Sequence, residues 1–210
     1  MRPDNVLAFD TSAAHCAAAL LLGNRVIHRV EPMAKGQAER LMPMLEEMLA
    51  EAGIGWRDLA VIGVGVGPGN FTGVRIGVAA ARGLALGLGI PAVGVTTLEA
   101  MALGAARPCV AMLDARREQL YVQVFDGGTA MLIGAGQELP LAPGTVLLGH
   151  NAEAGVGWHK GIVAQPAYPL AEAMARIAWA RRGEGRRPKP FYLRGADAAP
   201  PRDPPPVILP

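Results

Sequence analysis

The sequence is poor in cysteine, in aromatic residues and in charge. Of 210 residues, two are cysteine, 5% are aromatic and 18% are charged. Cys16 and Cys109 lie far apart in apolar runs, which is typical of small buried side chains in a reducing compartment. Few aromatics beside 27 glycines and 51% hydrophobic residues favour tight packing of helices on sheets over an aromatic-rich core.

Two classes of partner have little support in the composition. The net charge is +2 with both signs scattered, and we find no basic stripe or aromatic platform that would grip nucleic acid without help. No run of about 18 apolar residues lacks charge or glycine, and the first residues lack the apolar region of a signal peptide. We therefore expect a soluble cytoplasmic protein that makes no contact with membranes and has a self-sufficient core in one large domain or two small ones.

Common catalytic motifs are missing too. A metallopeptidase typically needs two histidines one helical turn apart, and no two histidines of this chain are spaced three or four residues apart. The sequence contains no Gly-x-Ser-x-Gly elbow, and neither cysteine has a basic partner nearby in sequence. We therefore expect no metal site. The histidines are His15, His28, His150 and His159.

The most informative segment is 61–77, in which a run of β-branched residues breaks on glycines and continues as a helix from about Thr72 to Gly89. A strand, a glycine turn and a helix N-terminus together can attract a phosphate. A dinucleotide fingerprint would require glycine where Thr72 stands, and a P-loop would require lysine where Val74 stands. The turn could bind a phosphate weakly, or its glycines could serve only to bring the helix close to the sheet.

A strand, an acidic turn and a second strand occur twice, at 6–22 and at 109–125. Asp10 and Asp114 occupy matching positions in these units, which predicts a duplicated α/β protein with two lobes, although a chance similarity is the alternative. Asp10 could hold a magnesium–nucleotide or simply cap its turn, and Asp114 has the same two interpretations, with Arg116 as an ion-pair partner. The candidates for a residual phosphate site are Asp10, Thr11, Ser12, Gly67, Gly69 and Asn70.

The remaining pattern alternates strands with helices. We expect further strands at 25–30, 59–66, 91–95 and 145–148, and helices at 36–52, 72–89, 97–104 and 170–182. Pro43 should kink the first helix or delay its start. The proline-rich end, 199–210, should be extended and lie outside the core.

Two helices show patterns that could serve an interface. In the second helix, small residues recur every four positions at Gly73, Gly77, Ala81, Ala85 and Gly89, which admits close approach by another backbone. The first helix is apolar beyond one stripe and rich in methionine, which adapts to irregular surfaces. We predict a packed helical interface; the alternative is that all these residues belong to the core. Arg75 could serve that interface, form a salt bridge or contact a phosphate.

Several segments resemble known proteins. Leu7-Ala-Phe-Asp-Thr-Ser12 is similar to the first phosphate turn of the actin, hexokinase and Hsp70 fold, and 67–77 is very similar to the GPG-S-FTGVRIG block of the TsaB (YeaZ) family. Segments 114–121 and 192–194 resemble later landmarks of that family. Segment 37–43 stands where the family usually has His-Ser-Glu-Arg-Leu-Leu-Pro. The resemblance covers roughly residues 5–195, and Asn70 for serine and Gln37-Ala38 for His-Ser depart from it.

This resemblance implies a duplicated ASKHA fold (ribonuclease H-like, actin-like ATPase), an α/β architecture of two lobes with mixed sheets flanked by helices. It divides the chain into an N-terminal lobe at 1–104 that carries the dimerisation helices, a smaller lobe at 105–195 and a proline-rich tail at 196–210. The implied interface residues are Glu39, Arg40, Leu41, Met44, Leu45, Met48, Gly73, Arg75, Gly77 and Ala81.

The family's role would be that of a non-catalytic subunit. It implies binding to TsaD, the catalytic paralogue that transfers threonylcarbamoyl to adenosine 37 of ANN-decoding tRNAs, with the ATPase TsaE joining at their junction. The chain would meet tRNA only through the complex, form a homodimer when alone, and need no cofactor beyond weak nucleotide binding. The alternatives are an autonomous nucleotide-dependent transferase and a glycoprotease of the M22 type, as an older name of the family suggests.

Overall fold

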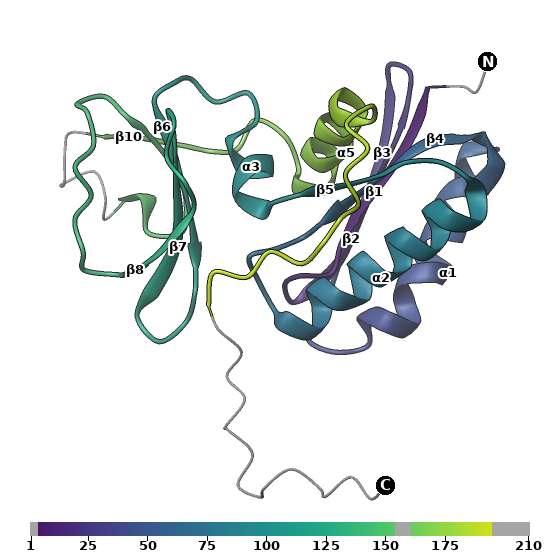
Figure 1. The fold of residues 1–210 in the computed structure, drawn as a ribbon, viewed down its shortest axis with the longest axis horizontal. Helices are drawn as coiled ribbons and strands as arrows, with labels where there is room; N and C mark the ends of the chain where they lie inside the picture. Colours follow the sequence, from purple (N-terminus) through teal and green to yellow (C-terminus); the bar gives the residue numbers. More distant parts are fainter. Residues whose placement is uncertain (1–3, 154–160, 195–210) are drawn as a thin grey trace, which may run out of the picture.

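Two five-stranded mixed sheets form the two lobes of the molecule (Figure 1). The computed structural model describes residues 4–153 and 161–194, so the predicted proline-rich tail lies outside the described residues. The strands of the first sheet are β1 (Asn5–Asp10), β2 (His15–Leu22), β3 (Arg25–Pro32), β4 (Leu59–Gly65) and β5 (Ala92–Val95). Those of the second sheet are β6 (Cys109–Asp114), β7 (Gln119–Phe125), β8 (Met131–Gly134), β9 (Val146–Gly149) and β10 (Ile162–Ala164).

The two sheets have the same topology. Their strand orders are β3-β2-β1-β4-β5 and, in the matching direction, β8-β7-β6-β9-β10. In each sheet the central strand pairs antiparallel with the strand that follows it in the chain and parallel with its neighbour on the other side. In the first sheet β1 pairs in this way with β2 and β4, and in the second sheet β6 pairs with β7 and β9. The predicted duplication of an α/β unit is therefore confirmed. Strands β8 and β10 were not anticipated from the sequence.

Helices cover both faces of the first sheet. The helices α1 (Gln37–Ala52) and α2 (Phe71–Leu88) lie side by side on one face, and α5 (Leu170–Arg181) packs on the other face against β1, β2 and β4 (Figure 1). The short helix α3 (Thr97–Ala102) contacts both α5 and β6 between the lobes, and a 3₁₀ turn, η1 (Trp56–Asp58), precedes β4. Because both of its faces are covered, β1 is buried along its whole length.

The position of α5 corrects the domain division drawn from the sequence. The range 105–195 had been assigned to the second lobe, yet Ala173, Met174 and Ala178 of α5 pack with Val6 and Ala8 of β1. The chain thus returns to the first lobe after completing the second sheet. The helix α1 begins at Gln37, directly after Gly36 as predicted, and runs on through the exposed Pro43, so the alternative of a later start is wrong.

The apolar side of α1 lies in the core of the protomer. Leu41, Met44, Leu45 and Met48 are all fully buried in one cluster with Leu7 and Phe9 of β1. These four residues were predicted to contact a partner, and the structure corrects that prediction. An amphipathic helix buries one stripe against its own sheet, and this stripe has the same sequence pattern as a stripe covered by a partner.

The small-residue stripe of α2 also faces inward. A Cβ atom added at Gly73 would lie 1.9 Å from the carbonyl oxygen of Thr11, and one at Gly77 would lie 3.0 Å from Thr11 Oγ1. Ala81 is fully buried in the same core cluster. Close approach to a backbone was therefore predicted correctly, but the backbone is the chain's own, which corrects the assignment of Gly73, Gly77 and Ala81 to the interface. The other predicted interface residues, Glu39, Arg40 and Arg75, lie at the surface or close to it.

Candidate functional site

A cleft of about 900 Å³ lies between the lobes, within the size range of small-molecule sites. Its walls come from the turn after β1, the glycine-rich turn before α2, the acidic turn after β6 and the segment 191–194. The first three are the segments that the sequence singled out, so the fold brings together Asp10, Gly69, Asn70 and Asp114 although they are up to a hundred residues apart. This is where active members of such a fold would hold a nucleotide.

Asp10 is fully buried at the base of this cleft. Its Oδ2 atom accepts hydrogen bonds from the backbone N–H and the hydroxyl of Ser12, at 3.2 and 3.0 Å, and from Nε2 of His15 at 2.7 Å. Its Oδ1 atom has no hydrogen-bond partner among the described residues and lies against Gly65, where an added Cβ would come within 1.9 Å of it. Asp10 therefore caps its turn, as one of its two interpretations held, and needs a glycine beside it on β4.

The two turns predicted to bind phosphate pack directly on one another. The backbone N–H of Asn70 donates to the carbonyl of Ser12 at 2.6 Å, and the Thr11 hydroxyl donates to the carbonyl of Gly73 at 2.7 Å. A Cβ added at Gly69 would lie 2.4 Å from the Ser12 carbonyl oxygen. Glycine is thus required at 69 and 73 so that two backbones can touch.

Two of the backbone donors at this turn, the N–H groups of Asn70 and Gly73, are already engaged within the chain. Asn70 is the N-cap of α2, and its Oδ1 accepts the backbone N–H of Gly73 at 2.9 Å. Its own backbone N–H is used by Ser12, and the nearest carboxylate, Asp10, disfavours an added anion. Asparagine and serine are both good N-cap residues, so Asn70 keeps the capping function that the family's usual serine would supply.

The acidic turn of the second lobe is built differently. Asp114 accepts a hydrogen bond at Oδ1 from the backbone N–H of Arg116 at 2.8 Å, so the contact predicted between these residues runs through the backbone. Arg116, Arg117 and Glu118 all have φ between 52° and 60°, the left-handed conformation that side chains disfavour. Arg194 donates to Gln119 and thereby ties the end of the described chain to β7.

The polar groups of the cleft do not form a hydrolytic relay. Ser12 and His15 both donate to the same oxygen of Asp10, whereas a triad requires histidine to stand between the nucleophile and the carboxylate. Burial raises the pKa of the Cys16 thiol to about 11 and also raises the pKa of Cys109, which makes both thiols poor nucleophiles. Within residues 4–153 and 161–194 no three histidine, cysteine or acidic side chains gather as metal ligands would.

A cluster at the rim of the cleft escaped the sequence analysis. The guanidinium of Arg75 stacks 3.7 Å from the centre of the Phe71 ring, and its Nε donates to the hydroxyl of Tyr192 at 3.0 Å. The rings of Phe71 and Tyr192 lie 5.0 Å apart, and both remain exposed. This contact joins α2 to a segment more than a hundred residues away, and only the family landmarks at 75 and 192 hinted at it.

Arg40 is committed to an ion-pair network of its own chain. It bonds Glu31 of β3 at 2.6 and 2.7 Å and Glu47 of α1 at 2.6 and 2.8 Å, and Arg29 bonds Glu47 and Glu51. Hydrogen bonds from Arg40 hold the pKa of Glu47 at about 2 and the pKa of Glu31 below its ordinary value. The network therefore fastens α1 to the edge strand β3, while Glu39 stays exposed beside it.

The outward side of α2 is apolar and uncovered. This helix has a mean hydropathy of 1.3 over 18 residues, yet only 33% of it is buried in the protomer. Among the described residues it is the one helix with the length and composition of a membrane span, but its inner side is packed on the first sheet. Its exposed residues recur at helical spacing and include two arginines beside apolar and small residues; they are Phe71, Thr72, Arg75, Ala79, Arg82, Gly83, Leu86 and Gly87.

Comparison with known proteins agrees with the sequence motifs. Residues 23–157 match the family model described as "TsaD: tRNA N6-adenosine threonylcarbamoyltransferase". The tRNA threonylcarbamoyladenosine biosynthesis protein TsaB of Escherichia coli K12 is 33% identical, over 90% of this chain and 94% of its own. The protein of that name from Bacillus subtilis 168 is 36% identical over 60% of this chain and 57% of its own.

Solved structures agree as well. YeaZ from Pseudomonas aeruginosa superimposes with a TM-score of 0.69 at 30% identity, covering 90% of this chain and all of that one. A second Pseudomonas aeruginosa structure, described as an uncharacterized protein with similarity to peptidase YEAZ, has a TM-score of 0.73 at 30% identity, with 91% and 100% covered. The predicted duplicated actin-like fold is thereby confirmed. The chain belongs to the TsaB (YeaZ) family of proteins involved in threonylcarbamoyladenosine modification of tRNA.

Proposed function

We propose that this chain is a non-catalytic subunit that binds TsaD and activates it for threonylcarbamoyl transfer to adenosine 37 of ANN-decoding tRNAs. The observation that supports this most directly is the uncovered apolar side of α2. Leu86 on that side is 83% exposed, and the helix as a whole is far more hydrophobic than its burial within the protomer requires. Exposed apolar helix faces of this kind mark protein–protein interfaces.

The surface formed by the outward sides of α1 and α2, which we call the helical face, carries both signs of charge. Glu39 and Glu46 lie exposed on α1, whereas Arg75 and Arg82 lie exposed on α2. A face with both signs can complement a second copy of itself across a two-fold axis. We therefore propose that the helical face forms a homodimer when the chain is alone and that TsaD displaces the second copy, with TsaE joining the resulting pair.

The chemistry of the cleft supports a supporting rather than a catalytic role. Its serine, histidine and aspartate are engaged with one another, and at the turn before α2 the N–H groups of Asn70 and Gly73 bond the chain's own oxygens. We propose that a nucleotide binds weakly in this cleft. We also propose that the protein acts in the cytoplasm, where tRNA is modified. Purified chain alone should hydrolyse neither ATP nor peptides, and turnover that follows the protein through every purification step would reject the proposal.

The decisive experiment reconstitutes the reaction. Threonylcarbamoyl transfer to tRNA should be measured with this chain, TsaD and TsaE together and with each omitted in turn. Ala79→Glu places a charge at an exposed position in the middle of the helical face, where a desolvated carboxylate without a partner would cost about 2 kcal/mol or more, roughly 30-fold in affinity for TsaD.

A matched control separates contact from added charge. Ile162 on β10 of the second lobe is 58% exposed, so Ile162→Glu adds the same charge to an apolar surface position away from the helical face. Ile162→Glu should bind TsaD and support transfer as the unchanged chain does. Equal binding by Ala79→Glu would show that TsaD docks elsewhere, and transfer that proceeds without this chain would reject the activating role.

A further inference from the structure

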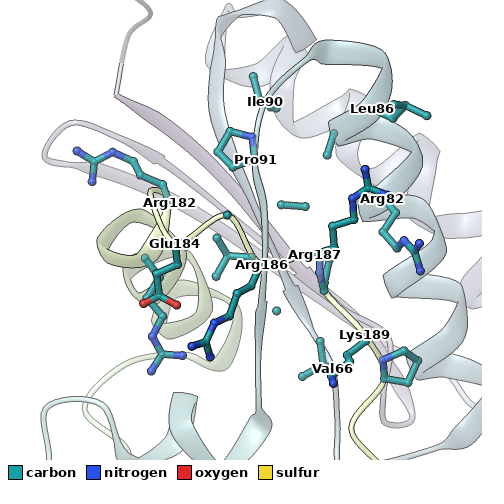
Figure 2. A pocket seen from close by; sticks show the side chains of 18 of the residues that line it. Val66, Arg82, Leu86, Ile90, Pro91, Arg182, Glu184, Arg186, Arg187 and Lys189 are labelled. Atoms are coloured by element: carbon teal, nitrogen blue, oxygen red, sulfur yellow. The ribbon is translucent and has the colours of Figure 1, made fainter.

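A groove of about 840 Å³ runs between the C-terminal half of α2, the start of β5 and the segment after α5 (Figure 2). Among the described residues it is lined by six lysines and arginines but by only one acidic residue, Glu184. The six are Arg82, Arg181, Arg182, Arg186, Arg187 and Lys189. Folding sets Arg82 of α2 beside the basic segment 181–189, and this grouping of positive charge was not anticipated from the sequence.

The basic segment is held in place by its own backbone. Pro188 is buried and packs on Gly94 of β5, where an added Cβ would lie 3.3 Å from the proline ring. Three residues on, the backbone N–H of Phe191 donates to the carbonyl of Val66 at 2.8 Å. Arg187 and Lys189 flank the buried proline and are themselves exposed, and Figure 2 shows both side chains at the groove.

Most of these cations have no acidic partner. Arg181 pairs with Glu99 at 2.8 Å, and Arg182 stacks on Trp179 at 3.6 Å. The other four form no ion pair with any described residue; they are Arg82, Arg186, Arg187 and Lys189. Exposed cations such as Arg25, Lys35 and Arg57 also form no ion pair with the described residues, but they do not line this groove. The gathering of four such cations around one groove favours an anionic ligand from outside.

We propose that this groove binds the phosphate backbone of tRNA. Its volume suits an extended polyanion rather than a single ion, and guanidinium groups match phosphate oxygens with paired donors. The one aromatic side chain among its lining residues, Phe191, is half-buried, so the groove offers no exposed ring on which bases could stack. Binding is therefore to the backbone and independent of sequence, and this chain adds affinity for tRNA while selection of the tRNA lies elsewhere.

This inference rests on the family's role in tRNA modification and not on the proposed contact with TsaD. Because Arg82 and Leu86 belong to both the groove and the helical face, the isolated chain is tested at a protein concentration at which sedimentation shows a monomer. A fluorescently labelled tRNA transcript is titrated with full-length protein, and binding is followed by anisotropy at several salt concentrations. Four phosphate contacts predict a slope of log affinity against log salt of about −3, which weakens binding on the order of 100-fold between about 50 and 200 mM. A tRNA that reads ANN codons and one that does not should bind equally.

Matched charge variants locate the site. Arg186→Ala/Arg187→Ala/Lys189→Ala removes three exposed cations of the groove and should leave a slope of about −1 with at least tenfold weaker binding at low salt. Arg25→Ala/Lys35→Ala/Arg57→Ala removes three exposed cations outside the groove and should bind as the unchanged chain does. Circular dichroism checks that both variants fold.

Four results would overturn the proposal. Equal losses in the two triple variants would mean that the charge acts without a defined site. Unchanged affinity in the groove variant would place the contact elsewhere, and absence of binding at low salt would remove the site altogether. Displacement of the tRNA by poly-glutamate at the same charge concentration would assign the groove to an acidic protein segment instead.

Discussion

The closest backbone contact of the molecule lies between α2 and the turn after β1, and it predicts opposite effects for the same substitution at two positions of one helix. Gly73→Ala would place a Cβ atom 1.9 Å from the carbonyl oxygen of Thr11 and 3.0 Å from its carbon. Cβ contacts shorter than 3.0 Å essentially never occur in proteins, so helix and turn must separate by about 1 Å. The turn cannot yield easily, because Thr11 is buried and bonded to the Gly73 carbonyl itself.

The change in the free energy of unfolding is the difference between two opposing effects, the cost of overpacking and the gain in helix propensity. Forcing an extra methyl into a filled, rigid site costs about 2–4 kcal/mol, while alanine in place of glycine inside a helix returns about 1 kcal/mol. Gly73→Ala should therefore lower the free energy of unfolding by about 1–3 kcal/mol. Gly83→Ala in the same helix has no atom within 4 Å of the new Cβ, so it should raise the free energy of unfolding by about 0.5–1 kcal/mol.

Equilibrium unfolding in urea measures both effects. Each variant is compared with the unchanged chain at two protein concentrations, because self-association would make the midpoint depend on concentration. Gly77→Ala, whose Cβ would lie 3.0 Å from Thr11 Oγ1, should fall between the other two. If Gly73→Ala is as stable as the unchanged chain, or more stable, then the contact between the two turns is not as tight as described.

Two further results are expected. Burial raises the pKa of Glu99, but hydrogen bonds from Arg181 and Thr96 outweigh this effect and hold the pKa below its ordinary value of 4.5. The stability that Glu99 contributes is therefore present above pH 4.5 and is lost as the pH falls through the lowered pKa. The difference in unfolding free energy between the unchanged chain and Glu99→Gln should shrink from about pH 6 to about pH 3, and a difference independent of pH would contradict this. Met48→Arg buries a charge in the core of the first lobe and should unfold the chain or make it insoluble, whereas Ala79→Glu should keep the far-ultraviolet circular dichroism of the native fold. A folded, monomeric Met48→Arg would show that Met48 belongs to an interface and not to the core.

The architecture could be predicted because it depends on local signals that repeat. The strand, acidic turn and strand that occur at 6–22 and again at 109–125 predicted the duplication. The glycine-rich segment 67–77 predicted the turn and the first residue of α2 to within one position. The capping role of Asp10 and Asn70 also follows from residue type alone, since both side chains bond nearby backbone N–H groups.

The direction in which helices face could not be predicted in the same way. Periodicity shows that Leu41, Met44 and Met48 share a side, but a covered side looks alike whether its cover is the chain's own sheet or a partner. The stripe at Gly73 and Gly77 raised the same difficulty. Small residues indicate that another segment approaches closely, but they do not show whether that segment belongs to the same chain or to a partner. The basic groove was missed for a third reason. Five of its six cations lie within 181–189, but the sequence does not show that folding places this segment beside Arg82 of α2.

The inner and outer sides of α2 are mechanically connected. Glycines at 69 and 73 let the start of the helix pack closely on the turn at Thr11 and Ser12, and this contact engages the backbone N–H of Asn70. The same contact fixes the height at which Arg75, Ala79 and Leu86 stand above the sheet. A variant such as Gly73→Ala that lifts the start of α2 should therefore disturb the helical face as well as the cleft. On this argument, a single contact between α2 and the turn after β1 shapes both the cleft and the helical face.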